Sequence, residues 1–397
     1  MTSKPPTIRL LDGAFYAGDP YAAFRWMRRH EPVFWDESGS VWGLSRHADV
    51  VHASAHPELF CSAGGSRPDA EPFPTMINMD NPEHNARRAL VNKGFTPRRV
   101  AQHEEFLRAN VRQLIDGVAP LGRCDFVQAL AAPLPMIMIG TLVGFRPDDR
   151  ERLQQWSDDM IAGTAADAPP DIAAAAAIAL VEYREHHEVI VADRRAHPRD
   201  DLMSILANAS EGGEHIDDYA LLHESLLLLI GGNETTRNVI SAAMAELLRH
   251  PDQRRKLAAD PGKIPVAVEE FLRWASPIVN MNRTATHDVE LCGRTIRAGD
   301  KVLLLYPSAN RDEDVFIEPD RFDVERDPNP HVAFGGHGAH HCLGANLARL
   351  EIRVLFEELL RRIPEVELAA GATIEHTPSN FVRGIHHLPI EFPPERR

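Results

Sequence analysis

A glycine-rich segment that ends on a single cysteine constrains this chain more than any other stretch. It runs from Phe334 to Gly344, and a helical pattern begins directly after it at Ala345. Backbone N–H groups and the positive end of the helix dipole favour a thiolate at Cys342 in such a position. Glycines let the backbone approach a large flat group, and a lone thiolate is a suitable axial ligand for haem iron. A buried structural cysteine beside a flexible turn explains the same residues equally well.

The longest helical pattern, Ile216 to Arg249, contains a polar interruption. It is apolar on all sides from Leu226 to Ile230, which is typical of a buried helix. The segment Gly231–Thr236 follows, although two glycines cost about 2 kcal/mol relative to two alanines in a helix. Polar groups in a buried helix need partners. Two interpretations stay open: a kink or short loop between two helices, or a local opening that admits a ligand and places an acid beside an alcohol.

Two other helical patterns carry charged residues at contact spacing. His84 and Arg88 lie four residues apart after the helix start at Asn81 and Pro82, so they share one face. Two cations on one face suit an anion, but a solvated basic face has the same pattern. Glu270 and Arg273 lie three apart and can also meet, although such a pair alone says nothing about function.

Charge and cysteine content exclude several classes of protein. The net charge of −15 makes nucleic acid and anionic membranes poor partners. The four cysteines are scattered, which supports neither a zinc ribbon nor a disulfide framework and fits a reducing cytoplasm. The N-terminus has no signal-like apolar run, and no stretch is long enough to span a membrane. We therefore expect a cytoplasmic protein without a membrane anchor.

The cysteine segment resembles the haem-ligand loop of the cytochrome P-450 family, written F-G-x-G-x-H/R-x-C-x-G. Five positions match: Gly336, Gly338, His340, Cys342 and Gly344. One residue is extra, because the family's phenylalanine lies seven positions before the cysteine, where this chain has Gly335, and Phe334 lies eight before it. This variant is similar to that of actinobacterial enzymes that oxidise sterol side chains. The resemblance implies haem b with Cys342 as the axial ligand of the iron.

The same resemblance assigns roles to the other motifs. The segment Gly231–Thr236 is similar to the family's oxygen-activation motif, which implies that Thr235 donates a hydrogen bond in oxygen activation and that Glu234 relays protons to it. The cofactor-binding residues implied beside Cys342 are His84, Arg88, Arg283 and His340 toward the propionates, and Gly344. A buried structural ion pair of Glu270 and Arg273, joined by Arg321, is implied behind the haem.

The resemblance covers nearly the whole chain and implies one mainly α domain with small β-sheets, residues 1–397, with haem between the long central helix and the cysteine-ligand helix. The implied pocket residues are Met76, Ile77, Gly231, Val279, Met281, Phe381 and Val382. Most are apolar, which suits a steroid or sterol hydroxylated at the terminal carbon of its side chain. A terpenoid, a fatty acid or a macrolide suits such a pocket as well.

The implied reaction uses O₂ and two electrons to form a hydroxylated product and water. No flavin or iron–sulfur segment is visible, so a ferredoxin and its reductase are the expected electron donors. They would dock on the side of the molecule that carries Cys342, where Arg98, Arg99 and Arg349 offer local positive charge. Two other functions are considered: a peroxygenase driven by hydrogen peroxide, which the Glu234–Thr235 pair argues against, and a non-catalytic haem sensor or carrier, for which no output domain is left.

Overall fold

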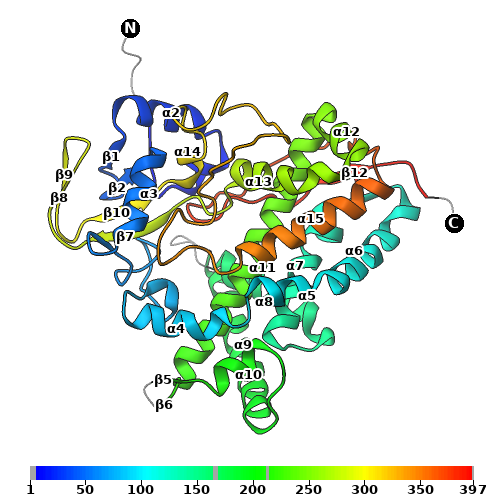
Figure 1. The fold of residues 1–397 in the computed structure, drawn as a ribbon, viewed down its shortest axis with the longest axis horizontal. Coiled ribbons are helices and arrows are strands. Elements are labelled where there is room, and N and C mark those ends of the chain that lie inside the picture. The colour runs from blue at the N-terminus through cyan, green and yellow to red at the C-terminus, as the bar shows by residue number, and fades with distance from the viewer. Residues whose placement is uncertain (1–5, 164–168, 212–213, 396–397) are drawn as a thin grey trace.

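The computed structural model describes residues 6–163, 169–211 and 214–395, and most of them lie in helices. Figure 1 shows a helical body and, beside the N-terminal elements, a smaller β-rich part. The α-helices are α1 (Gly13–Ala17), α2 (Tyr21–His30), α3 (His47–Ala55), α4 (Glu83–Asn92), α5 (Pro97–Gln102), α6 (Glu104–Val118), α7 (Pro133–Val143), α8 (Arg150–Ala162), α9 (Pro170–Ala196), α10 (Leu202–Ala207), α11 (Asp218–Arg249), α12 (Pro251–Ala259), α13 (Ile264–Ala275), α14 (Tyr306–Ala309) and α15 (Ala345–Arg362).

The strands form small sheets at the edge of the helical body. They are β1 (Val33–Asp36), β2 (Val41–Leu44), β3 (Phe60–Cys61), β4 (Arg123–Asp125), β5 (Ser210–Glu211), β6 (Glu214–His215), β7 (Met281–Ala285), β8 (Val289–Leu291), β9 (Arg294–Ile296), β10 (Lys301–Leu304), β11 (Glu367–Leu368) and β12 (Pro389–Glu391). The largest sheet has the order β1-β2-β10-β7-β3. Val302 on β10 faces Trp42 of parallel β2 and Arg283 of antiparallel β7. The predicted fold class, mainly α with small sheets, is confirmed.

The long central helix is α11, and its sequence explains both its start and its burial. The Asp217 side chain accepts the N–H of Ala220 and so caps the first turn. The helix is buried over most of its length and packs against α7, α13 and α15. It continues through Gly231 and Gly232 without a break. The alternative of a short loop between two helices is therefore wrong.

The two glycines of α11 have different surroundings. A Cβ at Gly232 would lie 2.8 Å from Cγ1 of Ile139 on α7, so only glycine allows the two helices to pack this closely. A Cβ at Gly231 would meet no described atom within 4 Å. Gly232 is therefore needed for helix packing, whereas Gly231 leaves exposed surface on one face of α11.

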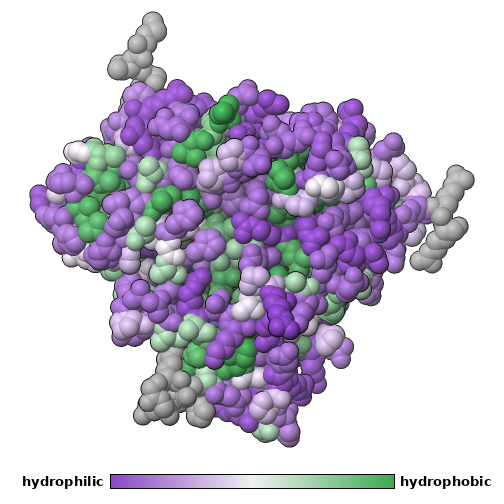
Figure 2. Space-filling model, in the orientation of Figure 1, coloured by the Kyte–Doolittle hydropathy of each residue, from purple (hydrophilic) through white to green (hydrophobic). Residues whose placement is uncertain are grey.

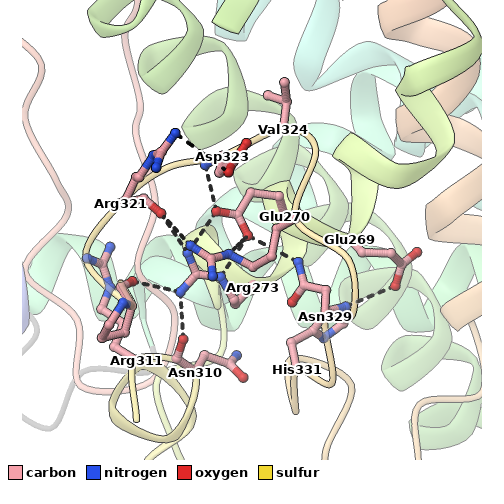
Figure 3. A network of polar contacts seen from close by, with 12 residues as sticks. Glu269, Glu270, Arg273, Asn310, Arg311, Arg321, Asp323, Val324, Asn329 and His331 are labelled. Carbon is pink, nitrogen blue, oxygen red and sulfur yellow. Dashed lines mark hydrogen bonds and ion pairs between the residues drawn. The ribbon is translucent and has the colours of Figure 1, made fainter. Parts of the chain in front are cut away.

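A buried carboxylate on α13 organises the segment that leads to the cysteine loop (Figure 3). Glu270 is 0% exposed and accepts hydrogen bonds from Nε and Nη2 of Arg273 at 2.7 and 2.8 Å. It also accepts from the backbone N–H of Asp323 at 2.9 Å and from Nδ2 of Asn329 at 3.1 Å. Arg273 in turn donates to the carbonyl oxygen of Asn310 at 2.8 Å. The predicted pairing of Glu270 with Arg273 is thus found as a buried hub.

The prediction that the Arg321 side chain joins this hub is wrong. The Arg321 side chain is 54% exposed and pairs with Glu318 at 3.0 Å, and Figure 3 shows it directed toward Asp323. Only its carbonyl oxygen takes part, as an acceptor from Arg273 at 3.2 Å. Arg326 instead reaches Glu270, with Nε at 3.1 Å from Oε2. The turn at this point directs Arg326 inward and Arg321 outward.

Figure 2 shows one face of the molecule, on which hydrophilic residues predominate and apolar patches are small. Of the described helices, none has the length and apolarity that crossing a membrane requires.

The arginines at 321 and 326 form a matched pair for testing the hub. We expect Arg326→Ala to lower the free energy of unfolding by about 1.5–3 kcal/mol, because Glu270 loses a charged hydrogen-bond donor in the interior. We expect Arg321→Ala to leave the unfolding midpoint unchanged. Urea unfolding of the haem-loaded protein measures both. Equal losses in the two variants would contradict the assignment of Arg326.

Substitution by alanine should have opposite effects on stability at Gly231 and at Gly232. Gly231→Ala should raise the free energy of unfolding by up to about 1 kcal/mol, because alanine is the better helix former and its methyl group meets no described atom. Gly232→Ala should lower it by about 1–3 kcal/mol through overpacking against Ile139. Adding Ile139→Ala to Gly232→Ala should cost less than the sum of the two single changes. Thermal and urea unfolding of substrate-free protein provide the test, and destabilisation by both glycine changes would contradict it.

Candidate active site

The cysteine loop is closed by backbone contacts. The N–H of Cys342 donates to the carbonyl oxygen of Phe334 at 2.9 Å. Gly335 and Gly336 have φ angles of 90° and 59°, a left-handed conformation that favours glycine. These two residues absorb the extra position, so Phe334 stays beside the cysteine despite the altered spacing. A Cβ at Gly338 would lie 2.0 Å from the carbonyl oxygen of Ser54, which places the loop directly on α3.

The surroundings of Cys342 act on its thiol in opposite directions. Its side chain is exposed, yet the protein encloses it closely enough that partial loss of hydration raises the pKa of the thiol. The N–H of Gly344, which caps α15, lowers the pKa, and so do the charges of Arg88 and Arg349. Arg349 also lies 4.6 Å from the centre of the Phe334 ring. Burial is the largest of these effects, so the pKa of the Cys342 thiol lies above its ordinary value, and the thiolate stays a prediction.

Four predicted cofactor-binding residues converge from α4, β7 and the cysteine loop: His84, Arg88, Arg283 and His340. The rings of His84 and His340 have their centres 4.1 Å apart. Burial lowers the pKa of His340 to about 3, and the charges of Arg283, His84 and Arg88 act in the same direction. Burial and then Arg88 also lower the pKa of His84. The positive charge of the group is therefore carried by Arg88 and Arg283, and the two imidazoles beside them are held in the neutral form.

The donors of this cluster fit the two carboxylates of haem b. Nδ1 of His84 is buried and has no hydrogen-bond partner among the described residues. Asp80, the acid that acts on His84, accepts the N–H groups of Ser62 and Ala63 at 2.8 and 3.0 Å instead. A buried imidazole nitrogen without a partner, beside two arginines, suits an anionic group to which it can donate in the tautomer that carries the proton on Nδ1. With a cysteine at a glycine-rich loop nearby, this chemistry fits haem b.

The oxygen motif places its acid and its alcohol on different faces of α11. Thr235 is half-buried, and its hydroxyl donates to the carbonyl oxygen of Gly231 at 2.7 Å. Glu234 is buried; Arg237 lies 2.5 Å from Oε2, and Asn238 donates to Oε1 at 2.9 Å. Consecutive residues leave a helix about 100° apart, so the carboxylate of Glu234 does not point at the hydroxyl of Thr235. The partners Arg237 and Asn238 were not predicted, although their spacing of three and four residues is a readable signal.

The predicted pocket residues come from four segments, which the structure ties together in two pairs. Ile278 and Val382 form a β-bridge, and the N–H of Val279 donates to the carbonyl oxygen of Phe381 at 2.9 Å. The η1 turn (Met76–Asn78) is held to α11, because the N–H of Met76 donates to Oε1 of Glu224 at 2.7 Å.

The sequence prediction places Val279 in the pocket, and the structure places it in the core. Val279 has no exposed surface and belongs to the N-terminal core cluster with Leu10 and Tyr16. It therefore packs in the core and does not line an open pocket. Met281, Ile77 and Phe381 are half-buried, whereas Met76 and Val382 are nearly enclosed at 7% and 9% exposure.

Comparison with known proteins agrees with these features. The Cytochrome P450 family model matches residues 172–261 and 264–389. A protein of Mycobacterium tuberculosis named steroid C26-monooxygenase is 45% identical over 99% of this chain and 98% of its own length. A Mycobacterium bovis protein named methyl-branched lipid omega-hydroxylase is 40% identical over 98% of this chain and 96% of its own length.

A solved structure gives the same result for the fold. A Mycobacterium marinum cytochrome P450 in complex with pseudoionone superposes with a TM-score of 0.90 at 35% identity, over 99% of this chain and 100% of that chain. The likeness thus extends over the cysteine loop, the cationic cluster and α11 alike. The chain therefore belongs to the cytochrome P450 family, whose members are monooxygenases with haem b as cofactor.

Proposed function

We propose that this monooxygenase hydroxylates the terminal carbon of a steroid or sterol side chain. A methyl group, O₂, two electrons and two protons yield a primary alcohol and one water molecule. The main support for this proposal is the 45% identity, over almost the whole chain, to a protein named steroid C26-monooxygenase. Hydroxylation of a methyl-branched lipid at its chain end is the second candidate, supported by the relative of that name at 40% identity. Both names place the reaction on an alkyl chain.

In this proposal the sulfur of Cys342 would hold the haem iron, and Gly344 contributes its N–H at the start of α15. The propionates are bound by His84, Arg88, Arg283 and His340. When bound, haem b would supply the iron that activates O₂, and a thiolate from Cys342 would add electron density to that iron. The unpartnered Nδ1 of His84 supports its assignment to a propionate.

The protons are assigned to the polar residues of α11. Thr235 would donate a hydrogen bond from its hydroxyl after that hydroxyl turns from the carbonyl oxygen of Gly231, its acceptor in the structure. Glu234 takes protons from solvent and passes them toward Thr235, a general-acid task. For this its carboxylate has to turn away from Arg237 and Asn238, its partners in the structure.

A ferredoxin with its reductase is the proposed electron donor, docking on the cysteine side. A groove there is bounded by α5, α6, α13 and α15. Two of the three arginines expected to attract the donor near this groove form ion pairs, which reduces the positive charge expected from the sequence. Arg349 pairs with Glu269 at 2.7 Å, and Arg99 pairs with Asp200. Arg98 is exposed, and no ion pair of it occurs in the described part of the chain.

The function is tested by binding and product analysis of the purified haem protein. Cholest-4-en-3-one, testosterone, a methyl-branched fatty acid and a monoterpene alcohol are titrated optically, then incubated with ferredoxin, its reductase and NADH. We expect cholest-4-en-3-one to bind most tightly and to yield the side-chain terminal alcohol, while testosterone, which has no such chain, gives no such product. Preference for the branched acid would select the second candidate. Turnover with hydrogen peroxide and none with ferredoxin would overturn the proposed electron supply.

A further inference from the structure

A buried carboxylate near the start of α11 holds the turn that carries two of the predicted pocket residues. The N–H of Met76, the first residue of η1, donates to Oε1 of Glu224 at 2.7 Å. The side chain of Glu224 is 0% exposed. A charged acceptor in the interior makes this a strong hydrogen bond, and its loss would leave a buried group unpaired.

A third element supplies a cation to the same carboxylate. Nη1 of Arg87 on α4 lies 3.2 Å from Oε1 of Glu224, and the Arg87 side chain is 8% exposed. Arg87 lies between His84 and Arg88 on α4, so the helix that carries part of the cationic cluster also carries this arginine. An ion pair that is removed from water is costly to break. One carboxylate thus joins α4, η1 and α11.

The residue before Glu224 on α11 adds an aromatic contact to the same segment. The rings of Phe73 and His223 are stacked with their centres 4.8 Å apart. The carbonyl oxygen of Phe73 accepts the N–H of Thr75 at 2.8 Å and Nδ2 of Asn78 at 3.1 Å. The ring contact is therefore continuous with η1, and two consecutive residues of α11 fix the place of one turn.

This turn meets α11 far from the oxygen motif. Thr235 comes eleven residues after Glu224, which corresponds to about 16 Å along a helix. A long substrate that reacts at one end beside Thr235 extends toward such a distance, whereas a small molecule at the reaction site does not. Contacts with a remote part of a substrate supply binding energy that positions its reacting end.

We propose that Glu224 is a positioning residue that gives the enzyme its preference for long substrates. Through η1 it holds Met76 and Ile77 where they contact the end of the substrate remote from the reacting carbon, and Arg87 keeps the carboxylate in place. The ligand is an apolar molecule long enough to extend from Thr235 to η1, which a sterol hydroxylated at its chain end satisfies. This inference rests on the proposed function, because it needs a reacting end and a remote end.

Two substitutions at Met76 separate its backbone contact from its side chain. Met76→Ala keeps the N–H, whereas Met76→Pro removes it. Proline suits the position, because Met76 is the first residue of η1 and Thr75 has the extended conformation that precedes proline. We expect Met76→Pro to bind cholest-4-en-3-one about tenfold more weakly than Met76→Ala, because a hydrogen bond to a buried carboxylate is lost. Optical titration of the ferric haem protein measures both affinities.

Variants of Glu224 show whether the N–H acts through the carboxylate. In the Glu224→Ala background, Met76→Pro and Met76→Ala should bind cholest-4-en-3-one equally, because the acceptor is already missing. Glu224→Gln keeps an acceptor oxygen but loses the ion pair with Arg87, so its affinity should lie between those of the wild type and Glu224→Ala. Glu246→Gln is the control, because Glu246 lies on the same helix and pairs with Arg249 at 2.6 Å. Its affinity should equal that of the wild type.

A small ligand separates positioning of the substrate from a general loss of structure. Imidazole binds haem iron and is too short to reach η1, so its affinity should be the same in all these variants. Cholest-4-en-3-one should bind Glu224→Ala more weakly and should yield more alcohol at carbons other than the terminal one. Haem content and the unfolding midpoint are measured for each variant. If Glu224→Ala does not retain haem, Glu224→Gln replaces it in every comparison.

The outcomes distinguish the inference from the proposed function. Equal affinities of Met76→Pro and Met76→Ala in the otherwise wild-type protein, or equal losses for imidazole and cholest-4-en-3-one in Glu224→Ala, overturn the inference while the proposed function stands. If the wild type binds neither cholest-4-en-3-one nor the methyl-branched fatty acid, the proposed function fails and the inference fails with it. If the wild type prefers the branched acid, that acid replaces the sterol and the same two results overturn the inference.

Discussion

The position of Cys342 depends on a carboxylate that lies in another helix. Glu270 fixes Arg273, and Arg273 holds the carbonyl oxygen of Asn310. The side-chain oxygen of Asn310 accepts the N–H of Val332 at 2.7 Å, and the cysteine loop starts its own backbone contacts from Val332. A continuous series of hydrogen bonds thus connects a buried ion pair to the loop. Because a buried charge that loses its partner costs about 3–5 kcal/mol, the ion pair is a firm anchor for the start of the loop.

Some polar side chains near the active site form hydrogen bonds or ion pairs within the protein, and one described nitrogen has no partner. The cationic cluster leaves Nδ1 of His84 without a partner in the described structure. Thr235, by contrast, uses its hydroxyl on the carbonyl oxygen of Gly231, and Glu234 is held by Arg237. A general acid needs a pKa near the working pH and freedom to exchange its proton. In the role proposed for Glu234, its ion pair with Arg237 therefore has to open before the carboxylate can exchange a proton.

Sequence reasoning predicted the elements that depend on local pattern and missed those that depend on tertiary packing. The span of α11 follows from apolar periodicity, whereas the residues around Cys342 were assigned from the resemblance of the loop to a family motif. Arg321 and Arg326 lie in the same irregular segment, and no spacing rule tells which one turns inward. Val279 looks like a pocket residue by its neighbours, but its burial is decided by the N-terminal core cluster, far away in the sequence.

Thiolate ligation by Cys342 is the central claim, and the spectrum of the reduced carbon monoxide complex tests it most directly. A thiolate ligand shifts the Soret band of this complex strongly to the red, whereas a neutral histidine ligand does not. We expect the red-shifted band in the purified haem protein and its loss in Cys342→Ser that still folds and retains haem. A folded wild-type protein with the spectrum of a histidine-ligated haem would contradict the account.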